Sequence, residues 1–214
     1  MEDCRKCANL CASRTQIVKP DLPEFECAPS TSAADSRPCR VLVIGEAPGA
    51  DEDAQGKGFV GRAGRTLHAL LEEHGLRRGH DYGCANIVRC RPSENRKPTE
   101  IEIGMCLPNL ANTIADARPA AVLAVGETAT RAITGIRGLS ENLRFLRYHD
   151  HDPIPAEMLC NLKIRAMWPH GAKLFPMPHT SPLAWNRNAP DDGRKWSAWG
   201  REQVSLLAAL LPKG

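Results

Sequence analysis

The sequence of 214 residues has few aromatic side chains, no long hydrophobic run and almost no excess of charge. Aromatic residues make up 5%, so the position of each Phe and Trp carries weight. No stretch approaches the roughly 20 consecutive apolar residues that a membrane-spanning helix requires. The charged start, MEDCRKC, is followed by no apolar run typical of a secretory signal. We therefore expect a cytoplasmic protein that makes no contact with a membrane.

The charges nearly cancel, because 28 Lys and Arg face 25 Asp and Glu, for a net charge of +3. Such a small total does not indicate a nucleic-acid-binding protein, although it is compatible with a local basic face. The composition of 42% hydrophobic and 25% charged residues is that of a folded protein, which argues against intrinsic disorder. The length suits one ordinary domain over residues 1–214.

Nine cysteines are many for a chain of this kind. In a reducing compartment such thiols rarely form disulfides. Metal binding, catalysis and simple burial remain as explanations.

Short apolar runs alternate with segments of helical periodicity. Runs at 40–44, 85–88, 121–125 and 174–177 predict buried strands. Apolar residues spaced three and four apart predict helices around 67–74, 103–114 and 199–211. We expect an α/β fold, a single-domain three-layer sandwich around a central, mainly parallel, four-stranded sheet. Two segments stand apart: residues 1–39 read as a short N-terminal element and a long loop, and the basic, irregular segment 136–170 reads as a possible insertion.

Polar motifs follow the predicted strands. They are GEAPG at 45–49 with GFVGR at 58–62, Asn86 with RCRP at 89–92, GET at 126–128, and PHTSPL at 178–183. Each alone is typical of a turn, and the first is not a Walker phosphate loop, because no Gly-Lys-Ser/Thr follows. Since parallel strands end at one edge of a sheet, where ligands bind, we expect all four motifs on one rim.

These motifs, in this order, resemble a known family. GEAPGADEDAQGKGFVGRAG, NIVRCRPSENRKPT, a Cys-Leu-Pro-x-Leu helix and His-x-Ser-Pro-Leu are similar to the iron-sulfur uracil-DNA glycosylases, usually numbered family 4, of the uracil-DNA glycosylase superfamily. The resemblance covers roughly residues 1–135 and 174–211. Departures lie at Gly58 and Thr180, where the family usually has Pro. The chain also lacks the Lys-Arg-Arg-Ile-His stretch of relatives that bond covalently to DNA.

The resemblance implies a 4Fe-4S cluster held by Cys4, Cys7, Cys90 and Cys106. The spacing of these residues alone does not separate an iron-sulfur cluster from zinc, since both accept four thiolates. The other cysteines, Cys11, Cys27, Cys39, Cys84 and Cys160, fit ordinary burial better.

The resemblance also implies an activity, hydrolysis of the N-glycosidic bond of uracil in DNA, which leaves an abasic site for base excision repair. His179 is then the hydrogen-bond donor to uracil O2. Many members of the best-known family have an aspartate where this chain has Ala47, so we expect Glu52 to position water or to stabilise the sugar cation. Phe59 is expected to stack on the base and Asn86 to bind its Watson-Crick edge.

Further expectations concern the pocket wall and the DNA. Glu46 and the backbone around Ala47 are expected to line the same pocket. Leu183 is the candidate wedge for the space that a flipped nucleotide leaves, and Ser181 and Arg187 are candidates to hold the strand. The expected partner is uracil-containing DNA, bound by a monomer.

Two other readings fit parts of the sequence. A redox protein would use the four cysteines for electron transfer and would need no rim of Phe59, Asn86 and His179. A zinc-stabilised DNA-binding module without catalysis would need only a basic face. Its candidates are Arg89, Arg91, Arg96, Arg187, Arg194 and Lys195.

Overall fold

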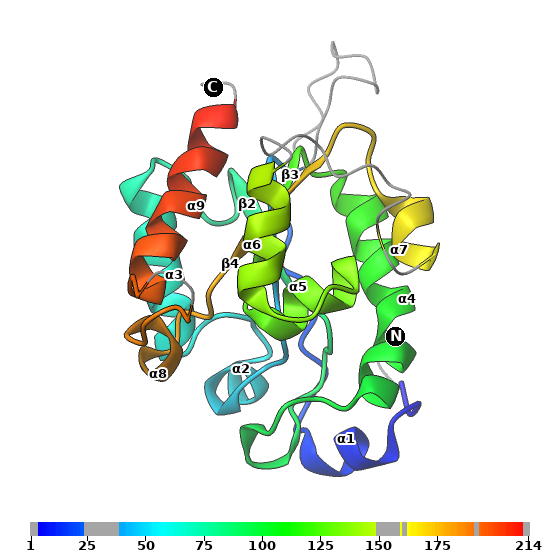
Figure 1. The fold of residues 1–214 in the computed structure, drawn as a ribbon. Helices are drawn as coiled ribbons and strands as arrows, with labels where there is room; N and C mark the ends of the chain where they lie inside the picture. Colours follow the sequence, from blue (N-terminus) through cyan, green and yellow to red (C-terminus); the bar gives the residue numbers. More distant parts are fainter. Residues whose placement is uncertain (1–3, 24–38, 149–158, 160–161, 191–192, 212–214) are drawn as a thin grey trace.

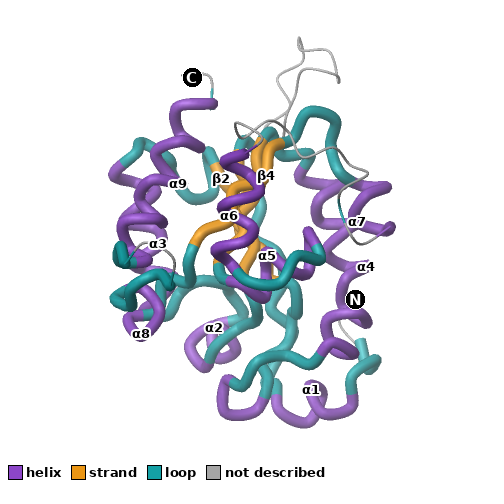
Figure 2. Tube along the Cα trace, viewed as in Figure 1, coloured by secondary structure: helices purple, strands orange, loops and turns teal. Residues whose placement is uncertain are grey.

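The computed structural model describes residues 4–23, 39–148, 159, 162–190 and 193–211. Its central sheet contains strands β1 (Val41–Gly45), β2 (Tyr82–Asn86), β3 (Ala121–Val125) and β4 (Lys173–Met177). All pairs are parallel, in the order β2-β1-β3-β4. Figure 2 shows these strands enclosed between helices, so the predicted sheet and fold class are confirmed.

Helices cover both faces of the sheet. Alternate residues of β1 point to opposite sides: Val41 and Val43 join one core, and Leu42 and Ile44 join the other. The first core packs under α3 (Arg62–Glu73) and α9 (Trp196–Leu210). The second packs under α4 (Glu100–Ala117), α5 (Glu127–Thr134) and α7 (Leu162–Met167), so the three layers lie as Figure 1 shows.

The long helix α4 begins with a capping box. Thr99 Oγ1 accepts a hydrogen bond from the Glu102 N–H at 3.2 Å, and Glu102 Oε2 accepts one from the Thr99 N–H at 2.8 Å. This pair satisfies two N–H groups that a helix start leaves unpaired. It places the start of α4 three residues before Ile103, the first apolar position of the predicted pattern.

Strand β2 differs from its predicted range of 85–88. It spans Tyr82–Asn86, and Ile87 and Val88 are buried beyond its end. The sequence YGCAN has little of the β-branched character that marks a strand, whereas the buried IV that follows has it.

The segment 136–170 is not irregular where the structure describes it. It contains α6 (Leu139–Tyr148) and α7, which contact α5 and α4, respectively. Leu139, Leu143 and Leu146 do recur at helical spacing, a signal obscured by the neighbouring charges. The His and Asp residues of 149–152 lie outside the described residues.

The N-terminal segment contains α1 (Ala8–Ser13) and then runs beside β2, at the edge of the sheet (Figure 1). The Thr15 and Gln16 N–H groups donate to the Asp53 carboxylate of α2 (Ala50–Gln55). Asp21 forms an antiparallel bridge with Cys84 of β2. No helix in the described part of the chain is long and apolar enough to cross a bilayer.

Candidate active site

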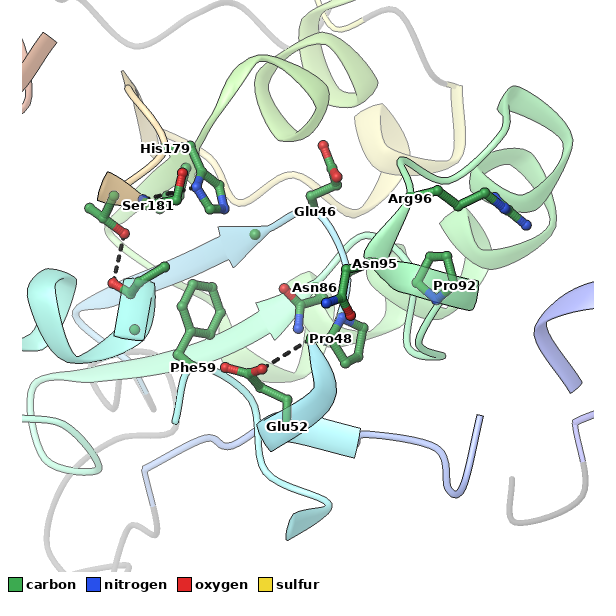
Figure 3. A pocket seen from close by; sticks show the side chains of 17 residues that line it. Glu46, Pro48, Glu52, Phe59, Asn86, Pro92, Asn95, Arg96, His179 and Ser181 are labelled. Atoms are coloured by element: carbon green, nitrogen blue, oxygen red, sulfur yellow. Dashed lines mark hydrogen bonds between the residues drawn. The ribbon is translucent and has the colours of Figure 1, made fainter. Parts of the chain in front are cut away.

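A cavity of about 350 Å³ lies at the carboxyl ends of all four strands. Its wall includes Gly45 at the end of β1, Asn86 at the end of β2, Val125 at the end of β3 and His179 just after β4. Figure 3 shows the side chains from these separate strands facing one space. The predicted common rim is therefore present. Of the predicted site residues, it brings together Glu46, Ala47, Glu52, Phe59, Asn86, His179 and Ser181.

Phe59 and Asn86 meet over the floor of the cavity. The floor is Gly45, where an added Cβ would lie 2.6 Å from Phe59 Cζ and 2.5 Å from Asn86 Oδ1. Only a residue without a side chain leaves both groups in place at this point. The result is an aromatic ring beside an amide at the end of β2, a combination suited to a flat, polar-edged ring.

The Asn86 side chain is buried, with 9% of its surface exposed. Within the described residues, its amide makes no hydrogen bond to protein. A buried amide without a partner is costly unless a ligand or water completes it. The hydrogen-bonding capacity of Asn86 is thus left for the contents of the cavity.

His179 is oriented by the backbone that follows it. The Ser181 N–H donates to Nδ1 of His179 at 3.1 Å, so Nδ1 is the acceptor and Nε2 carries the proton of the neutral ring. Burial lowers the pKa of His179, against the opposing effect of the Glu46 carboxylate. The site therefore presents a neutral imidazole with its N–H on Nε2.

The Glu52 carboxylate links two turns, and we call this link the Glu52 clamp. Its Oε2 accepts from the Gly49 N–H at 3.0 Å, and its Oε1 accepts from the Gly61 N–H at 2.8 Å. These bonds join the start of α2 to the start of α3, on either side of the Phe59 loop. Glu52 thus lines the cavity and also fixes its frame, a second role that its place in the ADED run does not indicate.

The loop after the RCRP motif adds Asn95 and Arg96 to the cavity wall; Asn95 was not anticipated, and Arg96 was anticipated only as part of a basic face. Two hydrogen bonds from the Arg96 guanidinium to the Glu102 carboxylate, at 2.9 and 2.7 Å, anchor their loop. These bonds are the main cause that lowers the pKa of Glu102 to about 2. Polar residues of a loop give no periodic signal, so only the fold shows that this one reaches the cavity.

A second hollow, of about 540 Å³, adjoins the first and shares Glu46, Asn95, His179 and Ser181 with it. It is lined in addition by Lys97, Leu183 and Arg187. Leu183 lies on the short helix α8 (Pro182–Trp185) and is 74% exposed, so it is not a core residue. The ring of Trp185 packs where Gly200 of α9 has no side chain, which anchors α8 beneath this exposed leucine.

A third, separate cavity of about 20 Å³ is lined by cysteine side chains. Cys4, Cys7, Cys90 and Cys106 line it, as expected, and Cys11 lines it too. The expectation for Cys11 was therefore wrong: it is half-buried, and its thiol lies 3.6 Å from the Cys4 carbonyl oxygen. One helical turn separates Cys7 from Cys11, so both side chains lie on the same face of α1. This spacing of four residues was the sequence signal that Cys11 would join the other cysteines. Cys39 and Cys84 are buried, as predicted, and Cys27 and Cys160 lie outside the described residues.

Comparison with known proteins decides the family. The model of the uracil DNA glycosylase superfamily matches residues 34–201. The chain belongs to the uracil-DNA glycosylase superfamily.

Several curated relatives are each named Type-4 uracil-DNA glycosylase. A protein of Thermotoga maritima is 36% identical over 157 residues, which cover 70% of this chain and 68% of that protein. A protein of Pyrobaculum aerophilum is 42% identical over 98 residues, 46% of this chain and 50% of the relative. One of Saccharolobus solfataricus is 45% identical over 91 residues, 42% of each. The chain thus spans about half the length of two of these relatives, and the comparisons favour neither the redox protein nor the non-catalytic module.

In this superfamily member, a guanidinium lies beside the cysteine cavity. Arg14 Nη1 donates to Cys90 Sγ at 2.9 Å, and Arg14 Nη2 donates to the Cys4 carbonyl oxygen at 2.8 Å. Burial, followed by the nearby Cys106 and Cys90, raises the pKa of the Cys7 thiol, which shows how near these groups are to one another. The described residues include no group of three or more His, Cys, Asp or Glu side chains arranged to hold one metal ion.

The six-residue basic face does not form as expected. The guanidinium of Arg89 is buried, where Nη2 donates to the Asn109 carbonyl oxygen at 2.9 Å and to Thr113 Oγ1 at 2.7 Å. Arg194 lies 4.0 Å from the centre of the Trp199 ring and pairs with Glu202 at 3.0 Å. Of the six, Arg187 lines the hollow next to the candidate site, together with Lys97, which was not predicted.

Proposed function

We propose that this chain is a uracil-DNA glycosylase, which flips uracil out of DNA and hydrolyses its N-glycosidic bond. One observation carries the proposal: the Phe59 ring, the unpartnered Asn86 amide and the oriented His179 imidazole line one cavity in a member of this superfamily. Together they match the face, the Watson-Crick edge and the O2 side of a single pyrimidine. The relatives' name, Type-4 uracil-DNA glycosylase, agrees with this substrate.

Base recognition uses Phe59 and Asn86. A flipped base in its pocket is read by stacking and by hydrogen bonds to its Watson-Crick edge. The Asn86 amide accepts from uracil N3–H through Oδ1 and donates to O4 through Nδ2. Cytosine presents the reverse pattern at these positions, so discrimination requires the amide to hold one orientation.

Bond cleavage uses His179. As the bond from the sugar to the base breaks, negative charge develops on the base, including on O2, and the Nε2–H of the neutral imidazole donates to it. One preorganised donor of this kind is worth about 10²- to 10³-fold in rate. The Ser181 N–H supports this role, because it fixes the tautomer that carries the proton on Nε2.

The sugar side requires an anion or a held water, because positive charge develops there. The methyl group of Ala47 supplies neither. Glu52 lines the cavity, and each of its oxygens keeps a lone pair beyond the one that a backbone N–H occupies. We propose that Glu52 positions the water or stabilises the sugar cation. Glu46 is proposed to line the pocket beside His179.

The adjoining hollow is proposed to take the DNA strand. Leu183, exposed on an anchored helix, fills the space that the base vacates. We assign phosphate contacts to Ser181, Lys97 and Arg187, which line this hollow, because attraction to DNA depends on local cations and not on the net charge of +3. The proposed enzyme acts as a cytoplasmic monomer.

A 4Fe-4S cluster on Cys4, Cys7, Cys90 and Cys106 completes the proposal. Soft thiolates that line one cavity form a donor set that fits such a cluster. When bound, the cluster would cross-link the N-terminal segment to the chain after β2 and to α4. Arg14 would offset part of the negative charge of the thiolates.

An oligonucleotide with a single uracil tests the activity. After incubation with the protein, alkali should cleave the strand at the uracil, because an abasic site is labile to base. The same oligonucleotide with thymine or cytosine in that place is the control and should stay intact. An intact uracil strand, or equal cleavage of all three, would contradict the proposal.

A further inference from the structure

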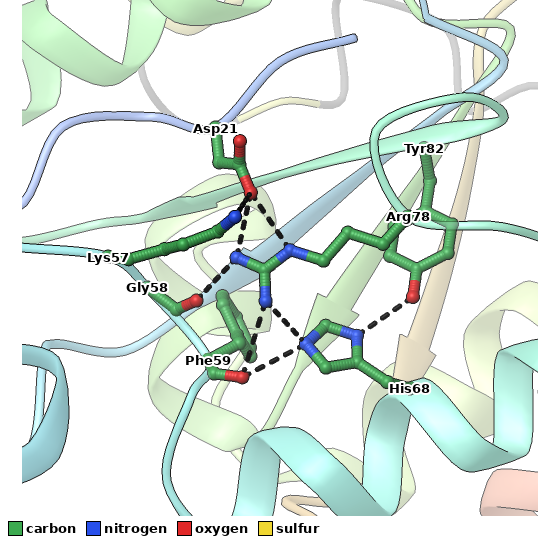
Figure 4. Close-up of polar contacts among 7 residues, drawn as sticks. All are labelled: Asp21, Lys57, Gly58, Phe59, His68, Arg78 and Tyr82. Atoms are coloured by element: carbon green, nitrogen blue, oxygen red, sulfur yellow. Dashed lines mark hydrogen bonds and ion pairs between the residues drawn. The ribbon is translucent and has the colours of Figure 1, made fainter. Parts of the chain in front are cut away.

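A polar network of residues that do not line the cavity contacts the backbone of the Phe59 loop (Figure 4). Its centre is Arg78, whose Nη2 donates to the Gly58 carbonyl oxygen at 2.6 Å. The next carbonyl oxygen, of Phe59, lies 2.9 Å from His68 Nε2 and 3.4 Å from Arg78 Nη1. Two consecutive backbone carbonyls of the loop that carries the aromatic ring are thus held by side chains from elsewhere in the chain.

Arg78 is itself held firmly. Asp21 Oδ2 accepts from its Nε at 2.9 Å and lies 2.8 Å from its Nη2. The Arg78 side chain is only 19% exposed, so this pair is largely shielded from water and salt. Backbone hydrogen bonds in both directions between Asp21 and Cys84, at 2.9 and 2.7 Å, fix the carboxylate to β2.

His68 is oriented from the opposite side. Its Nδ1 lies 2.8 Å from the hydroxyl of Tyr82, a fully buried residue of β2. Burial, and next the charge of Arg78, lowers the pKa of His68, so the ring is neutral at neutral pH. Arg78 Nη1 also lies 2.8 Å from His68 Nε2, so the guanidinium donates to this nitrogen and the neutral ring carries its proton on Nδ1. The donor to the Phe59 carbonyl is then Arg78 Nη1.

Phe59 needs such restraint because its backbone is strained. Its φ of 59° lies in the left-handed region, which a residue with a side chain rarely adopts. Gly64 of α3 presses against the same peptide, since a Cβ there would overlap the Phe59 carbonyl group. The ring direction follows from this backbone conformation, so the groups that hold the carbonyl also set where the ring lies.

We propose that Arg78 and His68 are positioning residues for the base slot, by which we mean the space between the Phe59 ring and the Asn86 amide in the cavity. Arg78 donates to the Gly58 and Phe59 carbonyls, and His68 orients the Arg78 guanidinium. Together they keep the Phe59 ring over Gly45, beside Asn86. The proposal rests on the uracil-excising function proposed above and assigns to it residues outside the cavity. Neither residue touches the substrate, so each acts only through Phe59.

A double-mutant cycle with Phe59→Ala tests this. Arg78→Lys keeps a cation for Asp21 but loses the guanidinium fork that reaches both carbonyls. The matched control is Arg77→Lys, because Arg77 pairs with Asp81 and His80 and lies outside the network. For each protein we measure the single-turnover rate on uracil DNA, the affinity for abasic-site DNA and the thermal midpoint.

Arg78→Lys is expected to lower the excision rate about 10- to 100-fold, as a small misplacement of a reacting group does. The affinity for abasic-site DNA should change by less than about twofold, because no base is stacked there. In the Phe59→Ala background, Arg78→Lys should change the rate by less than about twofold, since the ring it positions is gone. Arg77→Lys should behave as the parent protein.

Three outcomes overturn the inference: an unchanged rate in Arg78→Lys, an equal loss in the Phe59→Ala background, or an equal loss in Arg77→Lys. If Arg78→Lys does not fold, His68→Leu is put through the same cycle, with His68→Gln as the variant expected to recover most of the rate. Absence of excision by the parent protein would instead contradict the proposed function itself. The two failures are therefore distinguishable.

Discussion

The backbone N–H of Ser181 decides how His179 behaves, because it donates to Nδ1 and leaves no room for a proton there. Protonation would break this bond and turn the ring, and burial opposes it as well by lowering the pKa. The neutral form, to which we assign the catalytic role, therefore persists below the ordinary histidine pKa of 6.5.

A pH profile of the single-turnover rate checks this at the residue scale. The excision rate should stay level as the pH falls from about 8 to 6.5, and should decline only below that, as Nδ1 becomes protonated. A midpoint for the decline above 6.5 would show that the imidazole is not held in this way.

Leu183 allows a second test at this scale. Leu183→Ala should slow excision from duplex DNA by about tenfold or more and leave single strands nearly unaffected, because only a duplex must be opened, at a cost of a few kcal/mol. Leu162→Ala is a matched control, since Leu162 on α7 is 71% exposed and Leu183 is 74% exposed. Equal losses on both substrates would argue against a wedge.

Single residues were predictable from the sequence where a motif follows a strand, as for His179 after β4. What the sequence does not show is how such a residue is held. The clamp of Glu52 joins residues 49 and 61, and Arg78 reaches residues 58 and 59. These bonds depend on distances in space that no local pattern records.

At the scale of elements, the approach of α3 to the Phe59 loop depends on Gly64. Gly64→Ala should lower the free energy of unfolding by about 1–3 kcal/mol, as overpacking does, because its Cβ would overlap the Phe59 carbonyl. Excision should fall as well, because the loop must move.

Gly104→Ala is the matched control, since a Cβ at this exposed helical glycine of α4 meets nothing within 4 Å. It should stabilise the protein by up to about 1 kcal/mol. Urea unfolding measures both variants. Equal stability of Gly64→Ala and the parent protein would contradict the close packing.

Element positions were predictable where burial and periodicity coincide. The run AVLAV gave β3 with its bounds, because every residue is apolar and buried. Helix α6 was not predicted, because charged residues lie between its leucines. The predicted bounds of β2 were wrong, because its sequence has a weak β pattern. Cavity residues such as Asn95 come from a loop, which has no period to detect.

At the scale of the whole molecule, the N-terminal segment links the cysteine cavity to the base slot. Residues 4–11 supply Cys4, Cys7 and Cys11, and the same segment continues through the Asp53 contacts to Asp21, which holds Arg78. A cluster in that cavity would therefore support the slot from a distance, through the chain that it anchors.

Removal of the proposed cluster tests this link. Oxidation in the presence of a chelator should bleach absorbance near 400 nm and lower the thermal midpoint by about 10 °C, because the loss of a metal cross-link is among the largest destabilising changes. Amide hydrogen exchange should rise over residues 4–22 more than over β3. A colourless protein with one zinc, or unchanged exchange in that segment, would count against the cluster.

The central proposal is that the cavity at the strand ends binds a flipped uracil and that His179 donates a hydrogen bond to its O2 as the glycosidic bond breaks. The most direct measurement is the release of free uracil from an oligonucleotide with one uracil, followed by mass spectrometry under single-turnover conditions. The parent protein should release one uracil per strand, and His179→Ala should do so about 10² to 10³ times more slowly. No released uracil from the parent protein, or the same rate from both proteins, would contradict the account.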